Sequence, residues 1–206
     1  MKRYAPGALL LTTALLVSLL AWSGAAIAGP RDHEDGFFLR LSMGGGTAST
    51  ALDDGTDRLE MSGSAADLNF AVGAIVSPNF ALHGTLLGWS ASDPDLEFNG
   101  TTVGEINGDV TATAFGAGLT YFFMPVNMYL SGSLCFGGLE LDLGNFSGET
   151  DDGLMADVTL GKEWWVGDKW GLGAALGFTW HDFSDSSVDE NWTGNSFCLR
   201  FTATMN

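Results

Sequence analysis

The stretch FCLRFTATM, at residues 197–205, decides the fold because it alternates between two kinds of side chain. Every second residue, from Phe197 to Met205, is apolar, whereas cysteine, arginine and threonine occupy the positions between them. Successive side chains of a β-strand point to opposite faces of the sheet, so a period of two residues predicts a strand with one apolar face. The same alternation occurs over residues 37–44, 66–76 and 154–161, which predicts an all-β protein.

Turn residues divide the chain into eight such strands. Three short connections contain proline, asparagine or glycine, which favour tight turns: residues 77–79, 124–127 and 166–169. Four long, polar connections alternate with the short ones: about residues 46–64, 91–108, 140–152 and 182–194. The predicted strands contain no proline, as a hydrogen-bonded sheet requires: residues 36–45, 65–76, 80–90, 109–123, 128–139, 153–165, 170–181 and 195–205.

The side chains on the less apolar strand faces indicate whether the sheet lies in water or in a membrane. A soluble up-and-down barrel keeps large apolar side chains inside and charged ones outside, whereas a membrane barrel turns its apolar face to lipid. The less apolar faces here carry mainly glycine, serine, threonine and alanine, with an occasional charge. The sequence therefore predicts a single eight-stranded antiparallel up-and-down transmembrane β-barrel. Its short turns would lie on the periplasmic side and its long acidic loops outside the cell.

Composition argues against two other classes of protein. The 206 residues include 8 basic and 25 acidic side chains, a formal net charge of −17, so no basic stripe is available to bind nucleic acid. Apolar residues make up 46% of the chain, which is too high a fraction for intrinsic disorder. Charged residues reach only 16%, as expected when lipid-facing strands make up much of the chain and the acidic residues lie mainly in loops.

The first 28 residues have the pattern of an export signal. Lys2 and Arg3 precede an apolar stretch at residues 7–22, and Ala26 and Ala28 form a small-residue site of the kind that signal peptidase cleaves. The alternative is an uncleaved membrane anchor, although the apolar stretch is short for a helical span of ~20 residues. We expect a signal peptide over residues 1–28 and a mature outer-membrane barrel domain over residues 29–206.

Aromatic residues gather beside the short turns. They are Phe80, Tyr121, Phe122, Phe123, Tyr129, Trp164, Trp165 and Trp170. Amphipathic rings collect at the interface between membrane and water, so the clustering predicts an aromatic girdle at the short-turn end. Ordinary packing between the strands of each hairpin is the alternative. Lys162 and Lys169 lie at the same end, where long side chains can reach lipid headgroups.

These features resemble the eight-stranded OmpA-type barrels of Gram-negative outer membranes and the related OmpX and OmpW types. The resemblance rests on the alternating strands, the turn at residues 121–127, the strand end at residues 161–165 and the final strand. It implies a barrel in contact with outer-membrane lipid, lipopolysaccharide and the outer-membrane insertion machinery. We expect the barrel alone, without the C-terminal peptidoglycan-binding domain, which is a first departure from the family. We also expect a monomer. The chain departs from the family by ending in Met205 and Asn206 rather than in an aromatic residue.

Five ionisable residues fall on the predicted inner faces of the strands: Arg40, Asp67, Asp157, Glu163 and Arg200. Charges enclosed in a narrow barrel should be paired, because an unpaired buried charge is very costly. An eight-stranded barrel is just wide enough for side chains to fill it, which favours an interior polar network that plugs the lumen. The alternative is a narrow pore or a conduit for small or hydrophobic solutes.

No residue pattern points to catalysis, a metal or a cofactor. His181, Asp182 and Ser184 could form a cluster at the loop end, but no spacing motif supports an enzyme. Acidic residues occur in all four long loops without the spacing of a calcium-binding loop. The facing of His83 stays open, because both faces of its strand could be apolar. Cys135 and Cys198 are expected to be unpaired. We therefore predict a structural or surface-interaction protein with no enzymatic activity.

Overall fold

The computed structural model describes residues 32–34, 36–144, 146–186 and 190–206. The predicted signal peptide over residues 1–28 and the acidic loop residue Asp189 lie outside the described residues. The described part is all-β, and it forms no helix that is long and apolar enough to cross a membrane. Its strands are β1 (Gly36–Asp53), β2 (Arg58–Ser77), β3 (Phe80–Ser92), β4 (Asp95–Phe98), β5 (Thr101–Glu105), β6 (Asp109–Phe123), β7 (Met128–Leu143), β8 (Phe146–Glu149), β9 (Gly153–Trp165), β10 (Trp170–Asp185) and β11 (Glu190–Met205).

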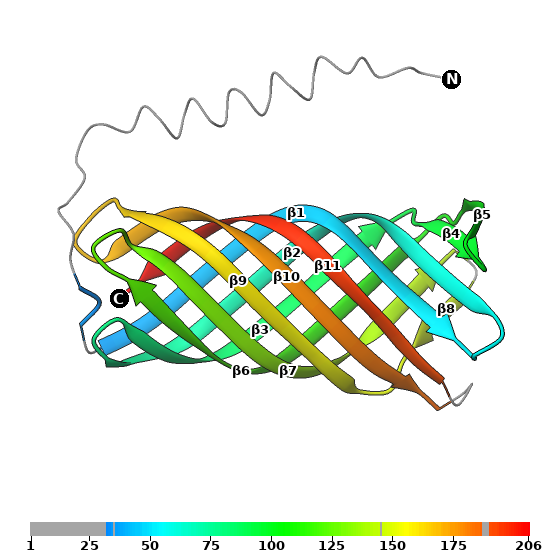
Figure 1. Cartoon of the computed structure of the whole chain (residues 1–206), viewed down its shortest axis with the longest axis horizontal. Helices are drawn as coiled ribbons and strands as arrows, with labels where there is room; N and C mark the ends of the chain where they lie inside the picture. The colour runs from blue at the N-terminus through cyan, green and yellow to red at the C-terminus, as the bar shows by residue number, and fades with distance from the viewer. Residues whose placement is uncertain (1–31, 35, 145, 187–189) are drawn as a thin grey trace, which may run out of the picture.

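Eight of these strands close into an antiparallel barrel, as the sequence predicts. β1, β2, β3, β6, β7, β9, β10 and β11 pair in this order, and β1 pairs with both β2 and β11 (Figure 1). Following the paired residues once around the barrel leads from Phe37 to Thr47, a stagger of ten residues. A stagger of this kind requires strands tilted relative to the barrel axis, and Figure 1 shows the tilt clearly.

The strands extend further at the long-loop end than the sequence predicts. β1 continues to Asp53 and β2 begins at Arg58, so most of the first predicted loop is paired sheet. The second long connection contains the β4–β5 hairpin, whose β4 pairs with β2, and the third contains β8, which pairs with β7. Most of these segments are short or rich in small and polar residues, and their apolar alternation covers only a few positions, such as Leu59 and Met61 of β2 and Leu96 and Phe98 of β4. Their backbone hydrogen bonds continue the sheet nevertheless.

The outer face of the barrel carries a band of exposed apolar side chains. Phe115, Leu199 and Phe136 are 71%, 61% and 58% exposed, and their neighbours along each strand point inward. Beyond the band, toward the long-loop end, the outward positions change to polar residues such as Asp109 and Glu140. An exposed apolar surface of this extent is typical of a barrel that faces lipid and is rare on a water-soluble protein.

Side chains of different chemistry point into the lumen along its length. Toward the short turns lies an aromatic group that includes Phe38, Phe122 and Tyr129. Charged and hydroxyl side chains fill the middle, among them Arg40 and Arg200. The half nearer the long loops holds a larger apolar cluster, which includes Trp89, Leu139, Met155, Phe183 and Trp192.

Candidate functional site: the filled lumen

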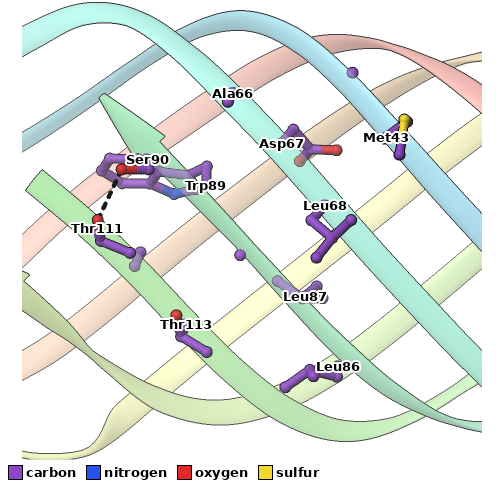
Figure 2. A pocket seen from close by; sticks show the side chains of 13 residues that line it. Met43, Ala66, Asp67, Leu68, Leu86, Leu87, Trp89, Ser90, Thr111 and Thr113 are labelled. Atoms are coloured by element: carbon purple, nitrogen blue, oxygen red, sulfur yellow. Dashed lines mark hydrogen bonds between the residues drawn. The ribbon is translucent and has the colours of Figure 1, made fainter. Parts of the chain in front are cut away.

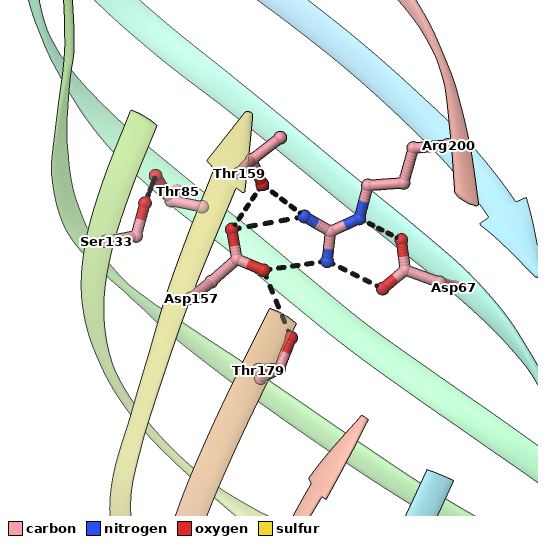
Figure 3. Close-up of polar contacts among 7 residues, drawn as sticks. All are labelled: Asp67, Thr85, Ser133, Asp157, Thr159, Thr179 and Arg200. Carbon is pink, nitrogen blue, oxygen red and sulfur yellow. Dashed lines mark hydrogen bonds and ion pairs between the residues drawn. The ribbon is translucent and has the colours of Figure 1, made fainter. Parts of the chain in front are cut away.

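Arg200 is the centre of the first ionic cluster in the lumen (Figure 3). Its Nε and Nη2 donate to the two carboxylate oxygens of Asp67, at 2.5 and 2.8 Å. Nη1 and Nη2 donate to the oxygens of Asp157, at 3.1 and 2.7 Å. Nη1 also donates to the Thr159 hydroxyl, and Thr159 and Thr179 each donate to Asp157. The guanidinium thus makes charge-assisted hydrogen bonds to two carboxylates, which are the strongest class of hydrogen bond in proteins.

Two glycines make room for the Arg200 side chain. Arg200 of β11 is paired with Gly44 of β1, and Gly44 is paired with Asp67 of β2. Because Gly44 has no side chain, the two charged groups can meet across the strand that separates them. On the other side, a Cβ atom at Gly177 of β10 would lie 2.4 Å from Cζ of Arg200. The guanidinium therefore lies directly over the backbone of β10.

Arg40 and Glu163 form the second ionic cluster, nearer the short turns. Arg40 Nε lies 3.8 Å from Glu163 Oε1, and the Arg40 guanidinium lies 3.9 Å from the centroid of the Tyr129 ring. Arg40 also donates to Thr204 and Thr120. Glu163 accepts hydrogen bonds from the hydroxyls of Thr204 and Thr202, which help to stabilise its negative charge. The cluster combines an ion pair with a cation–π contact, which is favourable where water is excluded.

The structure places all five predicted interior charges inside the barrel and brings them together in these two clusters. Each of the five residues is at most 6% exposed. Two guanidinium groups face three carboxylates, so the enclosed set carries an excess of one negative charge when all are ionised. Every described charge in the lumen therefore has a partner of opposite sign, as the cost of burial demands.

His83 also points into the lumen, which settles the facing that the sequence leaves open. Its Nε2 lies 3.0 Å from Thr120 Oγ1 and its Nδ1 lies 2.8 Å from Thr85 Oγ1. Thr120 donates in turn to Ser131, and Thr85 contacts a second serine. Sequence reasoning missed these hydroxyl bridges. Threonine is common in any strand, so nothing distinguishes the bridging threonines before the register is known.

Three of the eight predicted girdle residues are inside the barrel, which corrects that prediction. Phe122 and Tyr129 are fully buried and Trp165 is nearly so. The reason is the alternation itself: in the runs 121–123 and 164–165, adjacent residues must point to opposite faces. The outward members, which can form a lipid-facing belt, are Phe80, Tyr121, Phe123, Trp164 and Trp170.

His33, which precedes β1, closes the short-turn end of the lumen. Its ring stacks on Phe122 with centroids 3.6 Å apart, and it lies 5.0 Å from the ring of Trp165. Its Nε2 is 2.9 Å from Asn127 Oδ1, and its backbone exchanges hydrogen bonds with Asn79. Asn79 and Asn127 are turn residues with positive φ, a conformation that asparagine tolerates well. Because His33 stands outside every alternating segment, the sequence offered no signal for this contact.

Acidification is expected to weaken the His33 contacts. Burial lowers the pKa of His33 below its ordinary value of 6.5, and this effect outweighs the hydrogen bond with Asn127, which raises the pKa. The unfolded chain then binds the proton more readily than the folded chain. The stability contributed by neutral His33 is therefore complete above pH 6.5 and is lost as the pH falls from 6.5 toward the folded pKa.

Urea unfolding of the wild type and of His33→Ala over a range of pH tests this expectation. At neutral pH the variant should be less stable by ~2 kcal/mol, a typical cost of losing buried packing. The difference should shrink on acidification. His83 and His181 are present in both proteins, so their own titration cancels in the comparison. A difference that does not change with pH would contradict the assignment.

The residues considered for catalysis do not come together. His181 is buried in the lumen, where its Nε2 lies 3.0 Å from Thr50 Oγ1 and its ring stacks on Phe183. Asp182 and Ser184 occupy the outward-facing positions of the same strand. Cys135 and Cys198 are buried free thiols. Among the described residues, no group of three or more histidine, cysteine or acidic side chains is arranged to hold a metal ion.

A groove of about 470 Å³ crosses β2, β3 and β6 on the barrel wall (Figure 2). The exposed side chains of Met43, Leu68 and Leu86 flank it. Ser90 and Thr111, whose hydroxyls are 2.8 Å apart, lie farther toward the long-loop end. The lining also includes the buried residues Asp67, Leu87 and Trp89, whose side chains belong to the inner face.

Comparisons with known proteins identify the fold. No family model matches the chain, and no curated protein matches its sequence. Among solved structures, Neisserial surface protein A is similar over 84% of this chain and 99% of its own, with 14% identity and a TM-score of 0.58. The outer membrane protein OprG from Pseudomonas aeruginosa covers 88% of this chain and 100% of its own, with 13% identity and a TM-score of 0.44. Ail, the attachment invasion locus protein of Yersinia pestis, covers 81% and 97%, with 14% identity and a TM-score of 0.43. The first of these similarities supports the small β-barrel fold, in agreement with the resemblance found in the sequence.

Proposed function

We propose that the protein is an integral outer-membrane β-barrel with a closed lumen and a structural or surface-interaction role, and that it is not an enzyme. The observation that carries this proposal is the filling of the lumen along its length. An ion moving along the axis would leave the ionic clusters and meet the apolar cluster around Trp89, Met155 and Phe183. That cluster has no charges to replace water, so transfer into it is strongly unfavourable. The filling supports a plug over a narrow pore.

The purified full-length protein is expected to form no discrete channels in planar lipid bilayers. The apolar cluster and the two ionic clusters together leave an ion no hydrated route, so the current should stay at the level of the bare bilayer. A general porin reconstituted in the same way provides the positive control. Regular openings of the wild type would refute the closed lumen.

A separate experiment tests the membrane location. Release of the protein from washed membranes by high salt alone would show that it is not an integral membrane protein.

The outer surface supports the proposed location. The apolar band would contact lipid acyl chains, and the outward aromatic belt would lie at the periplasmic interface. In that belt Lys162 Nζ lies 5.4 Å from the Trp164 ring and donates to the carbonyl oxygen of Val126. We therefore propose outer-membrane lipid, lipopolysaccharide and the insertion machinery as the partners of the barrel, which acts as a monomer.

The hairpins beyond the membrane would present an acidic surface. Hydrogen bonds from the backbone amides of Asp57 and Thr56 lower the pKa of Asp54, so this turn stays charged in mildly acidic media. Hydrogen bonds from Ser186 likewise lower the pKa of Asp151. A surface of this sign would attract cationic partners and divalent cations bound to lipopolysaccharide, and the attraction would weaken with salt.

A further inference from the structure

A polar pocket of about 400 Å³ lies on the outer face of the barrel, toward the long-loop end. The volume lies within the range of ~300–1,000 Å³ that is typical of small-molecule sites. We call it the hydroxyl pocket, because most of the polar side chains that line it are serine or threonine. These polar side chains come from β1, β2, β4 and β11: Thr47, Ser49, Ser62, Ser64, Asp95 and Asn195.

Strand pairing sets the polar side chains of the hydroxyl pocket side by side. Ser49 of β1 pairs with Ser62 of β2 and with Asn195 of β11. Directly paired residues point to the same face of a sheet, and this face is the outer one, because the next residue, Ala48, is buried on the inner face. Asp95 of β4 pairs with Ser62 and therefore joins the same outer face.

A break in the pairing of β2 accompanies the hollow. β2 pairs with β3 as far as Ala65 and with β4 from Ser62 onward, so within the described sheet Gly63 and Ser64 pair with β1 alone. Pro94 lies at this break, since a Cβ atom at Gly63 would be 3.5 Å from its Cα atom. Main-chain geometry thus forms the pocket in advance, and a pre-formed site binds a ligand without a large ordering cost.

The hydroxyl pocket borders directly on the lipid-facing apolar band. Thr47 pairs with Ser64 of β2 and with Phe197 of β11, whose ring is exposed on the outer face. Along β2, the outward residues that follow Ser64 are Ala66 and the exposed Leu68. The outer face therefore changes from hydroxyl to apolar side chains within a few residues, which suits an amphiphile with a hydroxyl-rich headgroup and acyl chains.

The polar groups of the pocket suit an uncharged headgroup. None of the six polar side chains makes a hydrogen bond or an ion pair with another described residue. Hydroxyl and amide groups both donate and accept hydrogen bonds, as the hydroxyls of a sugar do. No lysine or arginine is among the lining residues, and the residue paired with Asp95 on β5 is a second acidic residue, Glu105. A phosphate would find no cation in this lining.

We propose that the hydroxyl pocket binds the sugar headgroup of a glycolipid, whose acyl chains lie on the apolar band beside Phe197 and Leu68. The inference rests on the proposed outer-membrane location, and it names both the headgroup chemistry and the part of the wall that contacts it. The hydroxyls of Ser49 and Ser62 would exchange hydrogen bonds with those of the sugar, and the Asp95 carboxylate would accept from them.

Three lipids with the same two oleoyl chains test the proposal: glucosyl-dioleoylglycerol, dioleoylphosphatidylcholine and dioleoylphosphatidylglycerol. Native mass spectrometry of the full chain measures their binding in a polyoxyethylene detergent, because a detergent with a sugar headgroup would compete. The glucosyl lipid should bind roughly fivefold more tightly than phosphatidylcholine, the equivalent of about one net hydrogen bond, and phosphatidylglycerol should bind most weakly. Equal binding of the three lipids, or a preference for either phospholipid, would overturn the proposal.

Variants then locate the site. The double variant Ser49→Ala with Ser62→Ala should weaken binding of the glucosyl lipid by roughly fivefold and should change phosphatidylcholine binding by less than about twofold. Ser64→Trp, which fills the pocket, should abolish the preference for the sugar. The matched control is the double variant Ser92→Ala with Ser184→Ala, which removes two outward hydroxyls outside the lining and should preserve that preference.

Two further readouts separate this inference from the proposed location. Heat-modifiable migration shows that each variant is folded, and resistance to extraction by high salt shows that it remains in the membrane. An unchanged preference for the glucosyl lipid in the Ser49 and Ser62 double variant, or in Ser64→Trp, would refute the pocket while leaving the membrane location intact. Release of the wild type by salt would instead refute the location on which the inference rests.

Discussion

Arg200→Leu is expected to lower the free energy of unfolding by ~3–5 kcal/mol, the cost of breaking a buried ion pair. The substitution removes the donors that satisfy Asp67 and Asp157 and leaves two carboxylates enclosed without a cation. Urea unfolding in lipid vesicles, followed by the shift between folded and unfolded bands on an unheated gel, measures the change. Additional substitution of Asp67→Asn and Asp157→Asn should recover part of the loss, because it removes the unpaired charges.

Arg58→Leu is the matched control for that variant. Arg58 also pairs with two carboxylates, Asp53 and Glu60, but its side chain is 47% exposed in the β1–β2 hairpin. Exposed pairs contribute at most ~1 kcal/mol, so this variant should unfold almost like the wild type. If Arg200→Leu were as stable as Arg58→Leu, the ionic cluster would not hold the barrel together.

Gly44→Ala is expected to impair closure of the barrel between β1 and β11. A Cβ atom at this position would lie 2.1 Å from the carbonyl oxygen of Leu199 and 2.9 Å from Cα of Arg200. Both are backbone atoms, so the two strands must separate to accept the methyl group. We expect a loss of ~3 kcal/mol, at the upper end of the usual cost of overpacking. The measurement is the fraction of refolded protein with heat-modifiable migration.

Gly132→Ala provides the comparison. A Cβ atom at Gly132 of β7 would have no heavy atom within 4 Å, so the added methyl group meets open space. This variant removes a glycine from a barrel strand just as Gly44→Ala does, and it should refold with the yield of the wild type. Equal yields for the two alanine variants would mean that the close approach at Gly44 does not limit closure.

The alternation of side chains accounts for how much of the architecture is predictable. The stretch around Phe197 and its counterparts specify strands with one apolar face, and the short turns order them into a closed barrel. The same period identifies the inward charges, because Arg40 and Arg200 each stand between apolar neighbours on their strands. Both inferences use only the alternation of side chains every two residues. This alternation is a local property of the sequence, and it is the same in the folded strand.

The features that were mispredicted or missed depend on backbone pairing and on contacts between distant segments, or on applying the alternation within a short aromatic run. Clustering beside a turn places Phe122 and Trp165 at the correct end of the barrel, but only the alternation within each run assigns them to the inner face. The extension of β1 to Asp53 follows from backbone pairing among small residues, which no hydropathy pattern marks. The contacts of His33 and the hydroxyl pocket require segments that only the closed barrel brings together.

The position of Arg200 on the last strand has a consequence for assembly. Its two carboxylate partners belong to β2 and β9, so both precede it in the chain. Until β11 docks, Asp67 and Asp157 have to remain hydrated or take up protons, and an open sheet that enters lipid with them unpaired is penalised. When β11 docks, Arg200 supplies the positive charge that the two carboxylates need, and the barrel closes between β1 and β11 in the same step. The ionic cluster thereby couples neutralisation of the carboxylates to closure of the barrel, which disfavours a partly inserted barrel of seven strands.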